Sequence, residues 1–315
     1  MTRTVRLILG LTSAMAIAGV VVVTTSGGGS KAAQSPATSK STTTSKTHHE
    51  TSRNWAGYVV DSKSGHSYSA VSGTWTVPKV TSTTGWGSTA DWVGIGGSSR
   101  NSKALEQTGT SSDVVNGKAK YYAWYEIVPA AETNFKLAVH PGDQMLGRVT
   151  VYGKTVTMSL LDKTTGHSVT KTQHPSKTDT SSAEWIAEAP SVQTPGGNDE
   201  VLPLDNFGKV TFANASATAG GQSGSISDPD GTTDQIRLTP GAPLSLPGHG
   251  TGAFALPALH FPSSGGATTG NLSSDGSSFS VSYTSSGTQS SSSAAIRRSS
   301  GLPGIPVGFG RRDGR

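Results

Sequence analysis

The sequence of 315 residues contains no cysteine, and charged side chains make up only 14% of it. Without cysteine the chain has no disulfide framework, no thiolate nucleophile and no cysteine-ligated zinc or iron–sulfur cluster. Helical periodicity is also missing, because no window of a dozen residues repeats its apolar positions every three or four residues. These absences exclude the cysteine-dependent classes of protein and disfavour a helical fold.

The net charge of +5 suggests a nucleic-acid partner, but the positive charge lies at the two ends of the chain. Residues 53–283 hold 15 lysines and arginines against 18 acids, a net charge of −3. A protein that binds a phosphate backbone places positive charge on its folded domain. We therefore expect no nucleic-acid partner.

Composition divides the chain into four parts. Arg3 and Arg6 precede an apolar run, so residues 1–30 resemble a signal peptide, and a membrane is a partner only if this segment remains as an uncleaved anchor. Residues 31–52 are rich in Ser, Thr and Lys and predict a linker or prosegment, and residues 285–315 predict a disordered basic tail. Residues 53–284 remain as the folded domain of a secreted, monomeric protein.

The domain carries short segments rich in β-branched and aromatic residues, each bounded by Gly, Pro, Asp or Ser. Examples are Val149–Met158, Val210–Ala213, Asp234–Leu238 and Phe279–Tyr283. Many short strands separated by turns predict an all-β fold, with antiparallel sheets packed as a sandwich or closed as a barrel.

Two of the predicted strands, at 121–128 and 183–189, mix carboxylates with bulky apolar residues. Alternation places the side chains of a strand on two opposite faces. In the first strand one face holds Tyr122, Trp124, Glu126 and Val128. In the second strand one face holds Glu184, Ile186 and Glu188. Single acids on a half-exposed strand normally face solvent, but a face that combines Trp, Tyr and Glu also suits an extended ligand.

Seven short motifs occur in a fixed order: Asn54-Trp-Ala-Gly-Tyr58, Gly73-Thr-Trp-Thr-Val-Pro78, Trp92-Val-Gly-Ile95, Gln107-Thr-Gly109, Tyr121-Tyr-Ala-Trp-Tyr-Glu126, Pro141-Gly-Asp143 and Ala183-Glu-Trp-Ile-Ala-Glu188. Together they resemble the eqolisins, the glutamic peptidases first known from fungi. The resemblance covers roughly residues 53–283, and by it the chain is identified as a secreted, bacterial-type member.

The resemblance implies a lectin-like jelly roll, an antiparallel β-sandwich of two large curved sheets with peptide substrates bound on the concave side. It implies a catalytic pair formed by Gln107 and Glu188, whereas Glu184 matches a non-catalytic acid. Trp92, Tyr122 and Glu126 are expected to bind substrate or support the pair. The implied chemistry needs no metal and no organic cofactor.

The sequence departs from the fungal pattern at two positions where that pattern has aspartate. They are Gly96, after Trp-Val-Gly-Ile, and Tyr122, in the Trp-Tyr-Glu motif. Acids close to a catalytic carboxylate raise its pKa, so their loss predicts a pH optimum less acidic than that of the fungal enzymes.

The chemistry of the pair is intelligible from the residue types alone. A carboxylate such as Glu188 takes a proton from water and returns it to the leaving amine. An amide N–H such as that of Gln107 stabilises the oxyanion of the intermediate. We therefore predict a secreted endopeptidase active at acidic pH. The alternatives are a non-catalytic, lectin-like carbohydrate-binding module and a structural protein of the cell envelope.

Overall fold

The computed structural model describes residues 47–62, 65–99, 102–193, 199–227, 231–240 and 265–285. Within these ranges the chain forms strands, turns and loops but no helix, which confirms the all-β prediction. The described part of the chain accordingly offers no helix suited to crossing a membrane. The predicted signal segment and all but the first residue of the predicted tail lie outside these ranges.

The described strands are β1 (Thr47–Ser52), β2 (Trp55–Ser62), β3 (Tyr68–Thr76), β4 (Trp86–Ile95), β5 (Glu106–Val115), β6 (Lys118–Ile127), β7 (Thr133–Asn134), β8 (Gln144–Tyr152), β9 (Thr155–Asp162), β10 (Ser168–Gln173), β11 (Ser182–Glu188), β12 (Ser191–Gln193), β13 (Asp199–Val201), β14 (Lys209–Ala219), β15 (Gln222–Gly224), β16 (Gly231–Leu238), β17 (Gly266–Thr269) and β18 (Phe279–Thr284).

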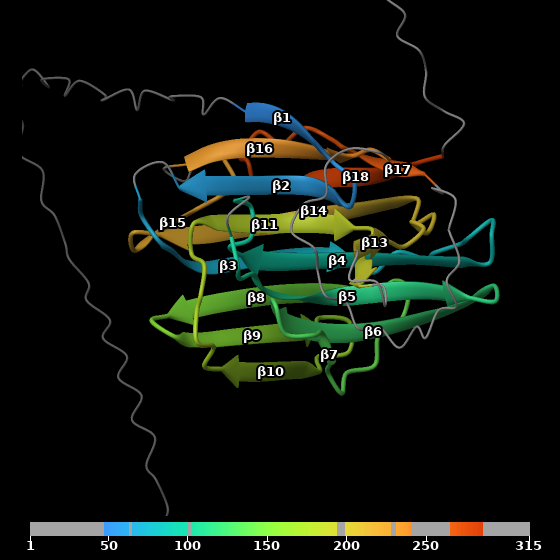
Figure 1. Ribbon diagram of the computed structural model, residues 1–315, viewed down its shortest axis with the longest axis horizontal. Helices are drawn as coiled ribbons and strands as arrows, with labels where there is room; N and C mark the ends of the chain where they lie inside the picture. Colours follow the sequence, from blue (N-terminus) through green and yellow to red (C-terminus); the bar gives the residue numbers. More distant parts are fainter. Residues whose placement is uncertain are drawn as a thin grey trace, which may run out of the picture. The chain divides into compact units, whose positions relative to one another are not determined.

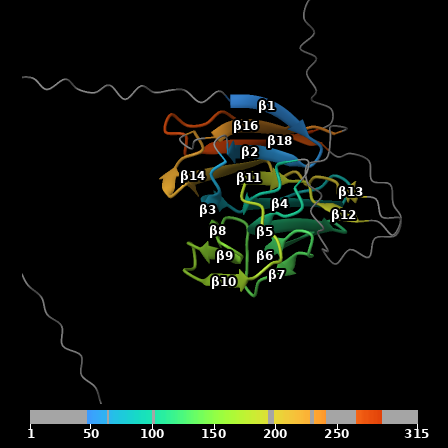
Figure 2. The same ribbon diagram turned by 60° about the vertical axis from the view of Figure 1, so that its left-hand side comes forward.

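One 16-stranded sheet folds over to make two layers (Figure 1). The first layer has the order β10-β9-β8-β3-β14-β18-β17, and the second has the order β16-β2-β11-β4-β5-β6-β7. Strands β4 and β5 pack on β8 and β9, and β11 packs on β3 and β14, as the turned view shows (Figure 2). The layers are joined where Leu238 of β16 pairs with Ala267 of β17. The sheet therefore forms a sandwich, not a closed barrel.

Two tryptophans hold the layers together through the core. The Trp75 indole on β3 donates to Thr110 Oγ1 on β5 at 2.9 Å. The Trp185 indole on β11 donates from the second layer to the first, to the Ser72 carbonyl of β3, at 2.8 Å. Gly147 leaves room for the Trp75 ring, since a Cβ there would lie 2.7 Å from it. Each buried N–H is satisfied across the interface, which fixes how the layers pack.

The segment Val149–Met158 is not a single strand but the hairpin that joins β8 to β9. Tyr152 pairs with Thr155 across a two-residue turn, and Gly153 has a φ of 57°. Glycine adopts this left-handed conformation without steric cost, which lets the chain reverse there. The apolar alternation continues through both strands, so the pattern alone did not reveal the turn.

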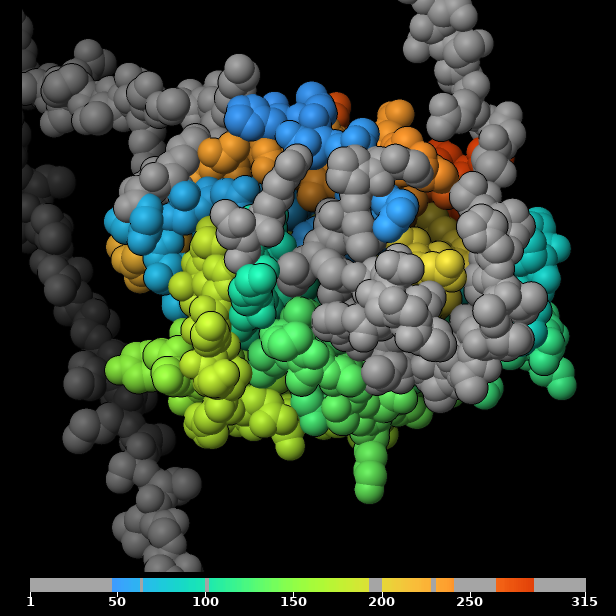
Figure 3. All heavy atoms as spheres, in the orientation of Figure 1, coloured from blue at the N-terminus to red at the C-terminus, as the bar shows by residue number. Residues whose placement is uncertain are grey.

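The predicted linker at 31–52 overlaps the sheet, because β1 occupies its last six residues. Strand β1 pairs in parallel with β16, and the space-filling view shows it as the blue rim above orange β16 (Figure 3). His48 lies 3.5 Å from Asp234 of β16. Most β1 side chains are exposed, so main-chain hydrogen bonds hold the strand. Composition did not predict it because it buries almost no apolar side chain.

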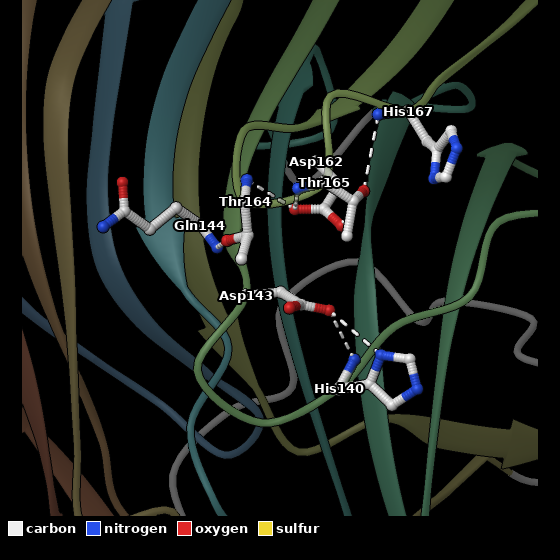
Figure 4. A network of polar contacts seen from close by, with 7 residues as sticks. All are labelled: His140, Asp143, Gln144, Asp162, Thr164, Thr165 and His167. Carbon is white, nitrogen blue, oxygen red and sulfur yellow. Dashed lines mark hydrogen bonds and ion pairs between the residues drawn. The ribbon is translucent and has the colours of Figure 1, made fainter.

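Two aspartates hold the turns at one end of β8 and β9 (Figure 4). Asp162 accepts the Thr164 N–H at 2.8 Å and also bonds to Thr165, whereas Asp143 accepts the His140 N–H at 2.7 Å. Burial raises the pKa of Asp162, but the hydrogen bonds from Thr165 and Thr164 together lower it below its usual value. The Pro141-Gly-Asp143 motif thus has a structural role.

Candidate active site

The outer face of the second layer carries an apolar cluster of its own, separate from the core between the layers. Its members are Trp55, Val59, Ala90, Trp92, Leu105, Trp124, Val128, Ile186 and Ile236. Trp124 and Ile186 belong to this outer cluster, whereas Ala123 and Trp185 belong to the inner core. The alternation predicted for β6 and β11 is therefore confirmed.

Cross-strand pairing arranges the outer side chains of β11, β4, β5 and β6 in three rows, because paired residues point to the same face. The first row is Glu184, Gly94, Gln107 and Glu126. The middle row is Ile186, Trp92, Gly109 and Trp124. The third row is Glu188, Ala90, Ser111 and Tyr122. Gln107 and Glu188 thus share one face, in rows on either side of Trp92.

Glu188 is held by two neutral donors. Trp92 Nε1 donates to its Oε2 at 2.8 Å, and Asn54 Nδ2 donates to its Oε1 at 3.1 Å. Only 6% of Glu188 is exposed. Burial raises the pKa of Glu188, the hydrogen bonds from Trp92 and Asn54 oppose that rise, and the resulting pKa is about 7. The carboxyl group is therefore oriented and titrates near neutrality.

Sequence reasoning assigned no role to Asn54, although it opens the first family motif. Ser52 Oγ donates to Asn54 Oδ1 at 2.9 Å, which turns the amide nitrogen toward Glu188. Both residues are buried. The signal in the sequence was a polar side chain directly before the aromatic strand β2, but only the pairing of β2 with β11 brings it to Glu188.

Gln107 contacts the acid beside it in the first row. Its Nε2 donates to Glu126 Oε2 at 2.6 Å, and within the described residues its Oε1 has no hydrogen-bond partner. Burial and the charge of Glu188 raise the pKa of Glu126 to about 8, against the hydrogen bond from Gln107. A primary amide carries two N–H groups, so one remains for a ligand.

Two glycines make room for Trp92 between Glu188 and Gln107. A Cβ on Gly94 would lie 2.9 Å from the Trp92 ring, and a Cβ on Gly109 would lie 2.6 Å from Trp92 Cβ. Trp55 meets the Trp92 ring edge-on, with 5.1 Å between centroids. Because such contacts leave no space for a larger side chain, the glycines of two family motifs keep the indole directed at Glu188.

Gly96 stands where the fungal pattern has aspartate, and its backbone explains the difference. Its φ is 84°, and a Cβ there would lie 2.5 Å from the Asp179 carbonyl oxygen. A side chain is thus excluded. Asp179 itself places a carboxylate beside this glycine, where it accepts from Ser102 Oγ and from the Gly97 N–H. An acid is therefore present near Gly96 although the sequence position lacks one.

Tyr122, the second departure, is also surrounded by acids. It packs against the outer cluster, and its hydroxyl bonds to Asp113, which also accepts from Ser88 at 2.7 Å. Glu132, from the segment between β6 and β7, interacts with Tyr122, and burial together with Glu126, Asp113 and Glu188 raises the pKa of Glu132. The two departures do not deplete the site of carboxylates, so the prediction of a less acidic optimum rests on the raised pKa of Glu188 and not on a loss of acids.

The fold and this face together define a sandwich that presents a buried carboxylate and an amide from different strands. The chain belongs to the peptidase A4 family, whose model matches residues 53–242. It is therefore a glutamic endopeptidase, and this membership favours the enzyme over the binding-module and envelope-protein alternatives.

Known proteins of this family resemble the chain in sequence and in fold. Aspergillopepsin-2 of Aspergillus niger is 32% identical over 206 residues, which cover 58% of this chain and 70% of that protein. Scytalido-glutamic peptidase, solved with a peptide-based transition-state analogue, has a TM-score of 0.54 at 24% identity and covers 73% of this chain and 98% of its own. SCP-B, an eqolisin solved with the tripeptide Ala-Ile-His, gives the same TM-score and coverage at 23% identity.

Proposed function

We propose that the protein hydrolyses peptide bonds with Glu188 as general base and acid and Gln107 as oxyanion donor. Glu188 takes a proton from water while the water oxygen attacks the carbonyl carbon. The free N–H of Gln107 donates to the oxygen that becomes negative. Glu188 then gives its proton to the amide nitrogen, and the C–N bond breaks. No metal or organic cofactor takes part.

The observation that carries this proposal is the arrangement around Glu188. A carboxyl group held by two neutral donors is oriented without a positive charge that would lower its basicity. Gln107 lies on the same face, and its hydrogen bond to Glu126 fixes the direction of its amide. A general base requires such orientation before its pKa matters.

The reaction class is tested by incubating the protein with a denatured protein substrate between pH 2 and 7, with pepstatin and a metal chelator present. We expect cleavage to continue with both inhibitors, because the proposed pair is neither an aspartate dyad nor a metal site. Loss of cleavage with either inhibitor would contradict the proposal. Peptide mapping by mass spectrometry distinguishes internal cleavage from trimming of chain ends.

Activity is expected to rise with pH through the acid range. The general base must be ionised, and burial raises the pKa of Glu188 to about 7 in the free enzyme. The pH profile of kcat/KM reports that ionisation. We expect kcat/KM to increase from pH 3 toward neutrality at temperatures where the fold is stable. A maximum at pH 2 to 3 would show that Glu188 does not act as an ionised base.

The Trp92→Phe variant is expected to move the acid limb of this profile to higher pH by about one to two units. The lost donor stabilised the carboxylate, and a hydrogen bond to a charged group contributes about 1.5–3 kcal/mol. Trp185→Phe is the matched control, because it also removes a buried indole bond but on the opposite face of β11. An equal shift in both variants would assign the effect to general loosening of the fold.

We also propose that the protein is secreted as a monomer. Support for secretion comes from the sequence alone, since Arg3 and Arg6 precede the apolar run Leu7 to Val23. Fractionation of cells and medium, followed by sequencing of the mature N-terminus, tests the signal peptide against the anchor alternative. Size-exclusion chromatography with light scattering tests the monomer.

A further inference from the structure

A pocket of about 810 Å³ adjoins the first row of the candidate active site, at the edge of the sandwich. Its lining includes Glu126 and the apolar residues that follow at the end of β6, from Ile127 to Ala131. The other side is formed by the end of β10 and the segment after it, from Gln173 to Lys177. A volume of this size is typical of a pocket that binds a ligand. The pocket therefore offers space next to the Gln107–Glu126 pair.

The charged groups at this pocket are mainly positive. Lys103 and Lys177 line it directly, and Lys171 Nζ lies 5.8 Å from the centre of the Tyr125 ring, which also lines it. Glu126 is the acid in the lining, and burial and the charge of Glu188 raise its pKa to about 8, so it carries no charge in the acid range. A pocket with apolar walls and cationic side chains in its lining suits a negatively charged side chain.

Burial and the charges of Glu126, Asp113 and Glu188 raise the pKa of Glu132, between the lining residues Ala131 and Thr133, to about 8, and two other acids close to the pocket have partners of their own. Asp179, two residues beyond Lys177, accepts hydrogen bonds from Ser102 and from the Gly97 N–H. Glu106, next to Leu105 of the outer cluster, accepts the Asp179 N–H at 3.4 Å, and burial raises its pKa to about 8. Neither residue lines the pocket. The lysines are therefore available to a ligand.

The position of the pocket relative to the proposed reaction centre follows from the strand order. Glu188 lies on β11 and Gln107 on β5, so a scissile bond between them lies over β4. The pocket begins at β6, two strands further. Strands are spaced about 4.8 Å apart, and an extended peptide advances about 3.3 Å per residue. A substrate that crosses the strands thus reaches the pocket about three residues from the scissile bond.

We propose that this pocket is a specificity subsite that binds an acidic side chain of the substrate, about three residues from the bond that is cleaved. The inference rests on the proposed function of Glu188 and Gln107. The occupant is a substrate and not one of the chain's own ends, because residues 1–52 and 284–315 each carry five basic residues and one acid. Segments with that charge are repelled by a pocket that carries Lys103 and Lys177.

The test uses fluorogenic peptides that share one neutral sequence and carry Asp, Ala or Lys at each of four positions on both sides of the cleaved bond. At one position, two to four residues from the bond, we expect kcat/KM to be about five- to tenfold higher with Asp than with Lys. The preference should weaken in 1 M salt, which screens exposed charges. Equal rates with Asp and Lys at every position would overturn the proposal.

Charge reversal in the pocket provides the control. The Lys103→Glu/Lys177→Glu double variant is expected to reverse the preference, so that Lys is favoured over Asp at that position. Lys209→Glu changes an exposed lysine on β14 of the other layer and should leave the preference unchanged. An Asp preference that survives the double reversal would locate the subsite elsewhere. The neutral peptide separates the two proposals, since failure to cleave it with wild-type protein would contradict the proposed function itself.

Discussion

The Glu188→Gln variant is expected to lose about 10²–10⁴-fold in kcat/KM, because an amide cannot take a proton from water. Glutamine has nearly the shape of glutamate and still offers an oxygen to Trp92 Nε1 or Asn54 Nδ2. The fold should therefore persist. The measurement is kcat/KM on a fluorogenic peptide, together with the melting temperature of each variant.

Glu184→Gln is the matched control for this experiment. Glu184 lies two residues earlier on β11, shares the outer face with Glu188, and is fully buried. Burial raises its pKa well above the usual value, which favours the neutral form that a glutamine mimics. We expect nearly full activity. Equal losses in both variants would mean that the strand, and not Glu188, is what the substitutions disturb.

Gln107→Ala is expected to cost about 10²–10³-fold in kcat with a smaller change in KM, because it removes an oxyanion donor. The substitution also leaves Glu126 without its 2.6 Å hydrogen bond. Glu126→Gln separates these effects, since it keeps a side chain that Gln107 can contact. If Gln107→Ala changed KM alone, Gln107 would be a binding residue and not an oxyanion donor.

The second large effect concerns stability, which is expected to fall as pH rises from about 4 to 8. Burial raises the pKa of Asp91, Glu106 and Asp205 to about 8 each. In this window the unfolded chain releases these protons and the folded protein retains them. Each such group then lowers the free energy of unfolding progressively as pH rises through the window. Stability is greatest at a pH below the pKa that these carboxyl groups have in the unfolded chain. The loss is complete once pH passes the pKa that they have in the folded protein.

Asp91→Asn isolates one of these groups. Asp91 is 2% exposed, and burial is the cause of its raised pKa. The variant should be more stable than the wild type by several kcal/mol at pH 7 and about equally stable at pH 3. Chemical denaturation at both pH values measures the difference. An equal effect at pH 3 and pH 7 would show that the carboxyl does not titrate on unfolding.

Asp162→Asn should show the opposite dependence. The hydrogen bonds from Thr164 and Thr165 lower the pKa of Asp162, so its contribution is present above the unfolded pKa and lost as pH falls (Figure 4). The variant is expected to be less stable at pH 7, with the deficit disappearing near pH 2. The two substitutions together test the direction in which each carboxyl group makes stability depend on pH.

The sequence predicted the parts of the site that lie within one strand. Two-residue alternation correctly placed Trp124 with Glu126, and Ile186 with Glu188, on one face of each strand, because the period of a strand is a local property. The family motifs then selected which acids to consider. The pattern of short apolar segments predicted antiparallel sheets packed as a sandwich or closed as a barrel, and the family resemblance selected the sandwich.

Contacts between strands could not be predicted in the same way. Asn54 reaches Glu188 only through the pairing of β2 with β11, and Glu132 approaches the site from a segment with no periodic pattern. Asp179 places an acid beside Gly96, although it lies far from the motif that contains Gly96 in the sequence. The register of paired strands and the position of each loop depend on the whole fold. The acids around Gly96 and Tyr122 were therefore missed.

The place of β2 in the sheet has a consequence for the order in which the protein is made. This strand follows β1 in the chain, but its two neighbours are β11 and β16, which are synthesised much later. A growing chain that ends before β16 leaves one edge of β2 unpaired, directly beside the strand that carries Glu188. Such non-local pairing folds slowly and only once the distant partner exists. The topology thus requires Gly231–Leu238 before β2 and the strand that carries Glu188 can reach their final pairing.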